Sequence, residues 1–128
     1  MKTILIVDDD SRNIFALSAI LKARGFKTES ATNVEDALTK LGEGNNTAFI
    51  LMDMMMPDMD GYEAIPLIKK QQRFQHIPII AVTAQAMSGD REKCLAAGAD
   101  EYISKPVDVD RLIEILKTEP HEEWCYNY

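Results

Sequence analysis

Two strand-like apolar runs in this chain end in aspartates, and this pairing limits the folds that the chain can adopt. The run at 3–7 is followed by Asp8, Asp9 and Asp10, and the run at 48–52 is followed by Asp53. Carboxylates that crowd together raise one another's pKa values or recruit a cation. Because hard oxygen ligands suit Mg2+ better than a soft metal, we expect an acidic, magnesium-binding corner where the two strand ends meet.

Apolar runs alternate with helix-like stretches along the chain. Strands are expected at 4–7, 26–31, 48–52, 79–82 and 101–103, and helices after the capping residues Asp10 or Ser11, Asn33, Asp60, Ser88 and Asp108. This alternation predicts an α/β fold, a parallel sheet with helices on both faces. Pro66 falls inside the third expected helix, where the loss of a backbone hydrogen bond should kink the helix or delay its start.

The residues with chemical potential lie at or just after the expected C-terminal ends of strands. Thr83 and Lys105 occupy such positions, as the aspartates do, and ligands of open α/β sheets bind outside these ends. A strand-end aspartate can attack phosphorus to form an aspartyl phosphate. Such a transfer depends on positioning and on neutralising the phosphoryl oxygens. Mg2+ beside Asp53, the Lys105 ammonium group and the Thr83 hydroxyl group can meet these requirements.

Composition excludes several classes of function. The net charge of -7 argues against a nucleic-acid-binding surface. No apolar stretch approaches the roughly 20 residues that span a membrane, and the start of the chain passes directly into a strand, which argues against a signal peptide. Cys94 and Cys125 lack metal-ligand spacing. We therefore expect a cytoplasmic protein with free thiols.

Four motifs, in order along the chain, resemble the receiver domain of two-component response regulators. They are ILIVDD at 4–9, LMDMMMPDMDG at 51–61, VTA at 82–84 and SKP at 104–106. The resemblance covers about residues 2–118 and implies a flavodoxin-like (βα)5 fold, with strand order 2-1-3-4-5. The chain resembles a single-domain chemotaxis regulator, and its Met-rich loop looks most like receivers of hybrid histidine kinases and phosphorelays.

The resemblance implies a role for each site residue. Asp53 would accept a phosphoryl group from a phosphohistidine on a histidine kinase or a histidine phosphotransfer protein. Asp8, Asp9, Asp53 and the backbone carbonyl of Met55 would bind Mg2+. Lys105 would pair with Asp53 or with its phosphoryl group.

The resemblance also implies a switch. Thr83 and Tyr102 match the family's switch pair, in which the threonine moves toward the phosphoryl group and the aromatic ring turns inward. A cis peptide bond is implied before Pro106, an isomer that costs little at X-Pro bonds. Half-buried packing is the alternative role for Tyr102.

Two positions that vary widely in this family carry Met55 and Gln85 here. Met55 has no charged or hydrogen-bonding side chain with which to position a hydrolytic water molecule. We therefore hypothesise that autodephosphorylation is slow, as a relay or a long-lived signal would need.

Three other functions share features with the receiver. The first is a haloacid-dehalogenase-like, Mg2+-dependent phosphatase with Asp8 as nucleophile, since residues 8–10 contain a D-x-D motif; Ser11-Arg12 does not continue that family's pattern. The second is a calcium-binding loop, but this chain lacks the glycine and the glutamate that such a loop requires. The third is a flavodoxin-like electron carrier, but no phosphate-binding loop follows the first expected strand of this chain. The receiver remains the predicted function.

We expect residues 1–119 to form the receiver domain and 120–128 to form a short tail, so the chain is a stand-alone or an excised receiver. It would be a phosphoacceptor with intrinsic autophosphorylation and autodephosphorylation only, and otherwise no enzyme. It would signal to an unknown protein target as a monomer, with dimerisation on phosphorylation left open. The tail carries Trp124, Tyr126 and Tyr128, which either fray or contact a partner.

Overall fold

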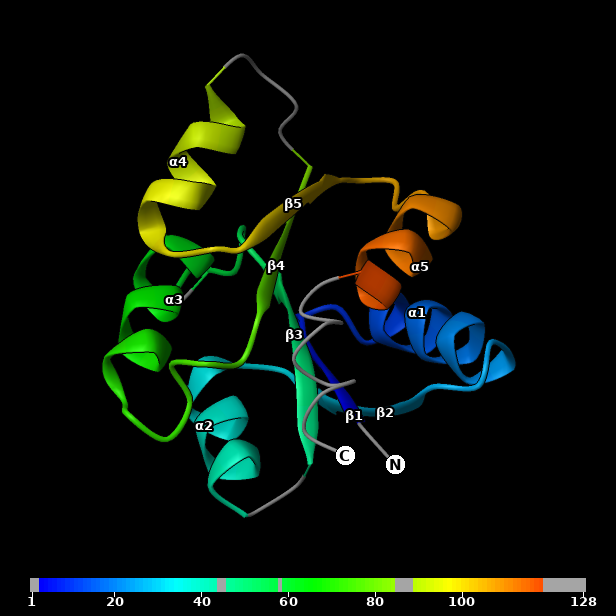
Figure 1. The fold of residues 1–128 in the computed structure, drawn as a ribbon, viewed down its shortest axis with the longest axis horizontal. Helices are drawn as coiled ribbons and strands as arrows, with labels where there is room; N and C mark the ends of the chain where they lie inside the picture. The colour runs from blue at the N-terminus through cyan, green and yellow to red at the C-terminus, as the bar shows by residue number, and fades with distance from the viewer. Residues whose placement is uncertain (1–2, 44–45, 58, 85–88, 119–128) are drawn as a thin grey trace.

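The computed structural model of the protein describes residues 3–43, 46–57, 59–84 and 89–118. The strands β1 to β5 form a single parallel sheet in the order β2-β1-β3-β4-β5. They span Thr3–Val7, Lys27–Ala31, Thr47–Asp53, Ile79–Thr83 and Glu101–Ser104. The helices α1 to α5 span Ser11–Ala23, Val34–Gly42, Gly61–Lys70, Asp90–Ala97 and Val109–Thr118. The predicted flavodoxin-like topology is confirmed (Figure 1).

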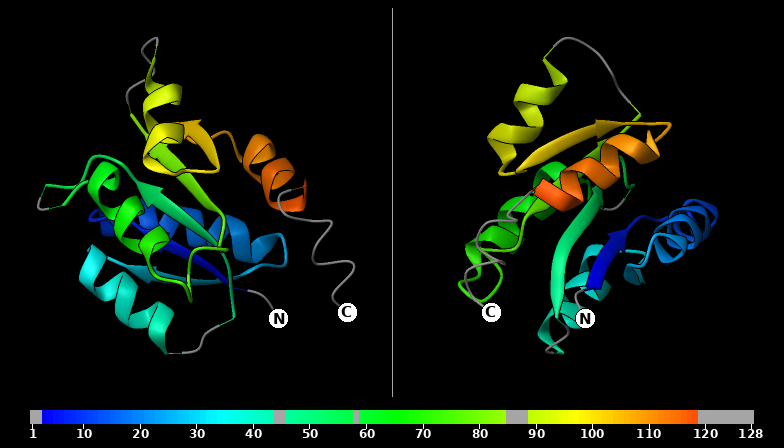
Figure 2. Two further views of the ribbon diagram at one scale, coloured as in Figure 1. Left: turned by 60° about the vertical axis from the view of Figure 1, so that its left-hand side comes forward. Right: turned by 45° about the vertical axis from the view of Figure 1, so that its right-hand side comes forward.

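Helices cover both faces of the sheet. Figure 1 shows α2, α3 and α4 on one side of the strands and α1 and α5 on the other, and the two views of Figure 2 agree. Because side chains alternate along a strand, Leu5 and Val7 of β1 join the core under α2, α3 and α4. Ile4 and Ile6 join the second core, under α1 and α5. The alternation therefore gives the domain two cores, one on each face.

The inner strands are apolar on both faces, and the edge strand β2 is not. All residues of β1 and β4 are buried, as expected for strands of a parallel sheet between two helical layers. In β2, Lys27 is exposed and Thr28, Glu29 and Ser30 are half-buried. The prediction that this polar strand lies at an edge is confirmed.

Most of the predicted helix caps are present. The side chain of Asp10 accepts a hydrogen bond from the Arg12 amide at 2.9 Å, and Asn33 and Asp60 accept from the amides of Asp36 and Glu63. At the start of α5, Asp108 accepts from the Arg111 amide. These bonds satisfy amides that lack partners within the first turn of a helix.

The starts of α4 and α3 differ from expectation. Helix α4 begins after Gly89, whose φ of 95° is left-handed and which makes no side-chain cap, so the prediction of Ser88 as the cap is wrong. Glycine adopts this conformation readily and turns the chain into the helix. Helix α3 starts directly after its cap and continues through the exposed Pro66. The expected delay is therefore wrong, and the kink stays a prediction.

Several expectations fall on residues that the structure does not describe. Ser88, Gln85 and the tail at 120–128 lie outside the described ranges, and the expectations about Gln85 and the tail stay untested. Within the described ranges, no helix has both the length and the apolar character that a membrane crossing requires.

Candidate functional site

Three carboxylates meet at the C-terminal edge of the sheet. Strands β1 and β3 are neighbours and Val7 pairs with Met52, so the next residues, Asp8 and Asp53, follow adjacent strand ends. Oxygen atoms of Asp8, Asp9 and Asp53 lie within 4.8 Å of one another. Asp8 and Asp53 are only 3% and 4% exposed, whereas Asp9 is exposed. The structure thus brings together the three predicted carboxylate ligands.

Backbone amides in the following turns hold the two buried carboxylates in place. The Asp10 amide donates to Oδ1 of Asp8 at 2.9 Å, and the Met55 amide donates to Oδ1 of Asp53 at 3.1 Å. Asp10 itself turns away to cap α1 and pairs with the Arg12 side chain. Of the three consecutive aspartates, Asp10 is therefore a helix cap outside the carboxylate cluster.

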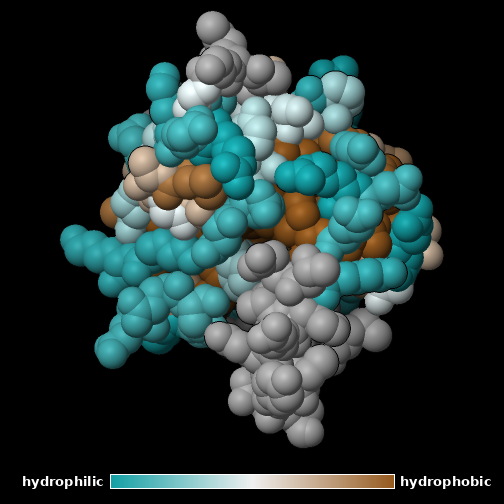
Figure 3. Space-filling view, turned by 45° about the horizontal axis from the view of Figure 1, so that its top comes forward, coloured by the Kyte–Doolittle hydropathy of each residue, from teal (hydrophilic) through white to brown (hydrophobic). Residues whose placement is uncertain are grey.

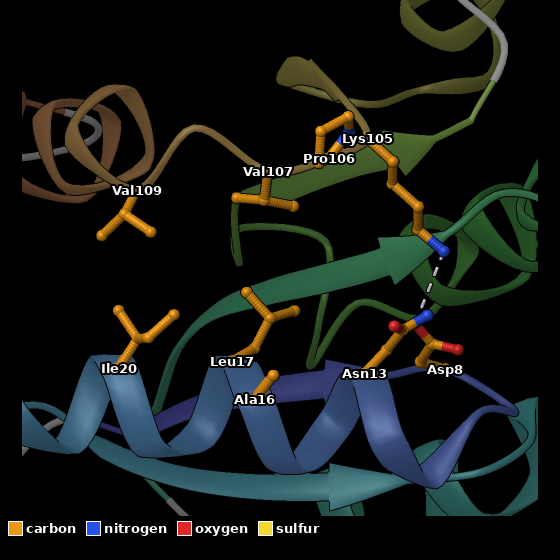
Figure 4. A pocket seen from close by; sticks show the side chains of 9 residues that line it. All are labelled: Asp8, Asn13, Ala16, Leu17, Ile20, Lys105, Pro106, Val107 and Val109. Atoms are coloured by element: carbon orange, nitrogen blue, oxygen red, sulfur yellow. Dashed lines mark ion pairs between the residues drawn. The ribbon is translucent and has the colours of Figure 1, made fainter.

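Lys105 brings a positive charge to this cluster. Its Nζ atom lies 3.6 Å from Oδ1 of Asp53 and 3.7 Å from Oδ2 of Asp8. The Lys105 amide donates to the Thr83 carbonyl at 2.7 Å, and the peptide bond to Pro106 is cis, as the resemblance implied. Figure 4 shows the lysine side chain reaching down to Asp8 across the ends of the strands.

The site carries more negative than positive charge among these residues. Burial is the main cause that raises the pKa of Asp8; the Asp10 amide lowers that pKa, the Asp53 carboxylate raises it and the Lys105 ammonium group lowers it. One ammonium group faces the two buried carboxylates of Asp8 and Asp53 and the exposed one of Asp9. The net negative charge that remains is costly at the buried groups without a compensating cation. Hard, closely spaced oxygen atoms are the donors that Mg2+ prefers.

The residues of the predicted switch pair lie on neighbouring strands. Thr83 ends β4 and is completely buried. Its register partner in β5 is Ser104, two residues after Tyr102. The half-buried Tyr102 packs against the core under α3 and α4. Burial first, then the charges of Asp90 and Cys94, raise the pKa of Tyr102.

Two hollows flank the carboxylates. An α1–α5 groove of about 470 Å3 opens beside Lys105 and is walled mainly by apolar side chains (Figure 4). In the space-filling view of Figure 3, hydrophobic surface gathers mostly on the side of the molecule that carries α1 and α5. A second hollow, of about 350 Å3, lies beside Asp9 and includes Met56 and Met59 in its wall.

Sequence reasoning missed a polar contact between α3 and α4. The Tyr62 hydroxyl of α3 lies 3.9 Å from the Cys94 sulfur of α4, within hydrogen-bonding range for sulfur, and Asp90 is buried at the start of α4. No local pattern links Tyr62 to Cys94, 32 residues further along the chain. Asp90 could have been identified as a residue of the first helical turn, because acidic side chains are favoured near the N-terminus of a helix.

Comparison with known sequences gives a match over most of the chain. Residues 4–117 match the response regulator receiver domain family. The polar-differentiation response regulator DivK of Brucella anthropi is 38% identical over 117 residues, which cover 91% of this chain and 94% of the relative.

Solved structures give the same result. A CheY-like response regulator receiver domain protein from Methanospirillum hungatei has a TM-score of 0.84 and 33% identity, with 98% of each chain covered. The receiver domain of a sensor histidine kinase from Pseudomonas aeruginosa has a TM-score of 0.80 and 36% identity, covering 91% of this chain and 94% of that one. That structure has a magnesium ion coordinated in its active site cleft.

Proposed function

Because the chain belongs to the response regulator receiver domain family, we propose that Asp53 is the residue on which it accepts a phosphoryl group. Receiver domains are signalling phosphoacceptors and not conventional enzymes. The observation that carries the proposal is the position of Asp53: its carboxylate ends β3 within 4.8 Å of two further carboxylates and 3.6 Å from the Lys105 ammonium group.

The donor set at this site fits Mg2+. Asp8, Asp9 and Asp53 offer hard oxygen atoms at close spacing, and the Met55 backbone carbonyl is the proposed fourth ligand. Bound there, the metal would neutralise phosphoryl oxygens during transfer. The Met55 amide and the Asp10 amide support this assignment because they orient the Asp53 and Asp8 carboxylates.

In the transfer, an oxygen of Asp53 attacks the phosphorus atom of a phosphohistidine on the partner. The new bond joins Asp53 to phosphorus, the bond from phosphorus to the imidazole nitrogen breaks, and that nitrogen keeps the electron pair. Lys105 lies close enough to Asp53 to neutralise the charge on the incoming phosphoryl group. A histidine kinase or histidine phosphotransfer protein is the proposed donor.

The phosphoryl group then acts on Thr83 and Tyr102. The Thr83 hydroxyl would turn toward a phosphoryl oxygen and leave space into which the Tyr102 ring rotates. Thr83 and Tyr102 lie on the neighbouring strands β4 and β5, and β5 packs against α4. This change would therefore bias the surface of α4, β5 and α5 between two states. The buried setting of Thr83 and the half-buried setting of Tyr102 support this switch.

The lifetime of the phosphorylated state should be long. The Met55 side chain is 49% exposed and apolar, so it offers no strong acceptor to orient a hydrolytic water molecule. An acyl-phosphate half-life of only a few seconds would contradict this part of the proposal.

We place the protein in the cytoplasm, where it acts as a monomer on a protein target, with 1–119 as the receiver domain.

A phosphorylation assay tests the assignment. The protein is incubated with Mg2+ and acetyl phosphate, and the acyl phosphate is located by borohydride reduction and peptide mapping. Label at Asp53 that disappears in Asp53→Asn is the expected result. Catalytic release of phosphate that depends on Asp8 and survives Asp53→Asn would instead indicate the haloacid-dehalogenase-like phosphatase.

A further inference from the structure

The methionines around the site differ sharply in exposure. Met55 is 49% exposed, whereas Met52 and Met54 are 0% exposed and Met56 is 6% exposed. A thioether must meet an oxidant in solution before it can be oxidised, and oxidation follows accessibility. Among these four neighbours, Met55 is therefore the one that a dissolved peroxide reaches in the folded protein.

The backbone of Met55 is also hydrogen-bonded to the reacting group. Its amide donates to Oδ1 of Asp53 at 3.1 Å, which fixes the Met55 backbone next to the carboxylate. The residue is 49% exposed, so its side chain meets solvent only two residues after Asp53. A change in the polarity of this side chain would therefore alter how water binds near the Asp53 carboxylate.

We propose that Met55 is an oxidation site, and that its sulfoxide shortens the lifetime of the phosphoryl group on Asp53. The inference rests on the proposed function, because it concerns hydrolysis of the acyl phosphate. The oxidant is hydrogen peroxide: a sulfur–oxygen bond forms, the peroxide O–O bond breaks, sulfur loses two electrons, and water leaves.

The sulfoxide changes what Met55 can do for a water molecule. A thioether is a weak hydrogen-bond acceptor, whereas the sulfoxide is polar and its oxygen is a strong acceptor. The oxygen accepts a hydrogen bond from water beside the phosphoryl group. That water forms a bond to phosphorus, the bond from phosphorus to Asp53 breaks, and Asp53 recovers its carboxylate with the electron pair while inorganic phosphate leaves.

Site selectivity is tested first, without phosphorylation. The folded protein is exposed to limiting hydrogen peroxide, and peptide mapping by mass spectrometry locates the gain of one oxygen atom. We expect Met55 to be oxidised before Met52, Met54 and Met56. Oxidation of these buried residues at the same rate as Met55 would overturn the proposal.

The lifetime is measured next, in wild type, Met55→Leu and Met59→Leu. Each protein is phosphorylated with acetyl phosphate and Mg2+, freed of donor, and followed before and after peroxide treatment. Dithiothreitol is added after treatment to reverse disulfide formation. Wild type and Met59→Leu should lose the phosphoryl group about fivefold faster after treatment, the factor that one ordinary hydrogen bond contributes. The lifetime in Met55→Leu, whatever its value before treatment, should not respond.

Two further measurements separate the possible explanations. Met55→Gln places an amide oxygen near the position of the sulfoxide oxygen and should shorten the lifetime without peroxide. Methionine sulfoxide reductase should restore the lifetime in treated wild type. A response that persists in Met55→Leu, or that disappears in Met59→Leu, overturns the inference. If no acyl phosphate forms before treatment, the proposed function fails instead.

Discussion

The Lys105 ammonium nitrogen lies 3.6 Å from Oδ1 of Asp53, at the end of a side chain that is 26% exposed. The same nitrogen lies 3.7 Å from Oδ2 of Asp8. Lys105 thus pairs with two buried carboxylates through one charge, and we expect it to pair with the phosphoryl group when one is bound to Asp53. Because the same carboxylates are the proposed metal ligands, replacing Lys105 should affect metal binding and phosphoryl transfer differently.

Replacing Lys105 should slow phosphoryl transfer and leave metal binding intact. In Lys105→Ala, phosphorylation of Asp53 by acetyl phosphate should be about tenfold slower or more, because one charge-assisted contact is lost. Mg2+ should bind at least as tightly as in wild type, because the ammonium group competes with the metal for the same carboxylates. Rates of labelling and a Mg2+ titration followed by calorimetry measure the two effects.

A conservative variant provides the control for this experiment. Lys105→Arg keeps the positive charge but changes its shape and reach, so its rate should lie between those of wild type and Lys105→Ala. Loss of Mg2+ binding in Lys105→Ala would show that the lysine organises the carboxylates instead of competing for them.

Removing the buried charge of Asp8 should stabilise the metal-free protein. The pKa of Asp8 is raised, mainly by burial, so the folded state favours the neutral carboxyl group. The stability from this group is fully present below the unfolded pKa near 3.8, and is lost as pH rises through the folded value. At neutral pH, Asp8→Asn should therefore raise the free energy of unfolding by about 1 kcal/mol.

Mg2+ supplies the matched comparison for Asp8→Asn. At a concentration of 100 times its Kd, the metal should stabilise wild type by about 2.7 kcal/mol and should stabilise Asp8→Asn far less. Urea unfolding at neutral and acidic pH, with and without Mg2+, measures both effects. An Asp8→Asn protein that is less stable than wild type without metal would contradict the electrostatic argument.

The strands and the carboxylate cluster could be predicted because each depends on local pattern and a general rule. Apolar runs locate β1 and β3, and parallel strands bring their C-terminal ends to one edge, so Asp8 and Asp53 must converge. The contact of Lys105 with both carboxylates is different. A lone lysine is usually a surface charge. Its position after a strand and the resemblance to a family indicated a role beside Asp53, but no pattern predicted that it would also pair with Asp8.

The features that could not be predicted depend on contacts between distant segments. Nothing in the sequence around Tyr62 indicates that its hydroxyl lies near Cys94. The start of α4 was misplaced because Ser88 has the chemistry of a cap, whereas the backbone turns at Gly89. The capping preference of a residue shows that it can start a helix, but tertiary packing decides at which of several neighbouring residues the helix starts.

Gly61 should tolerate no side chain, because the loop after Asp53 closes against it. A Cβ atom at Gly61 would lie 2.9 Å from the Met54 Cα and 2.2 Å from the Met54 sulfur. The Gly61 amide also donates to the Met54 carbonyl at 3.3 Å. Because backbone must move, Gly61→Ala should cost about 1–3 kcal/mol of stability and should slow labelling of Asp53, which precedes Met54.

Gly42→Ala is the matched control for this substitution. Gly42 ends α2, and the nearest atom to its added Cβ would be the Arg73 Nη2 at 3.8 Å. Its stability should stay within about 0.5 kcal/mol of wild type or rise, because alanine loses less chain entropy than glycine. Chemical denaturation measures both variants, and equal costs for the two would show that the Met54 contact is not what limits position 61.

Tyr62 should make the protein sensitive to alkali. Its pKa is raised to about 12, first by burial and then by the hydrogen bond with Cys94 and by the charges of Cys94, Asp90 and Asp60. A raised pKa means that the stability contributed by the neutral phenol is fully present below the unfolded value of 10 and is lost as pH rises toward about 12. Stability should therefore fall between these two values in wild type and fall less steeply in Tyr62→Phe. Denaturation at a series of alkaline pH values, with tyrosinate absorbance recorded in parallel, measures this difference.

Cys94→Ala, which removes the sulfur partner but keeps the phenol, should shift the tyrosinate transition downward in pH. An alkaline slope in Tyr62→Phe equal to that of wild type would assign the loss of stability to another group.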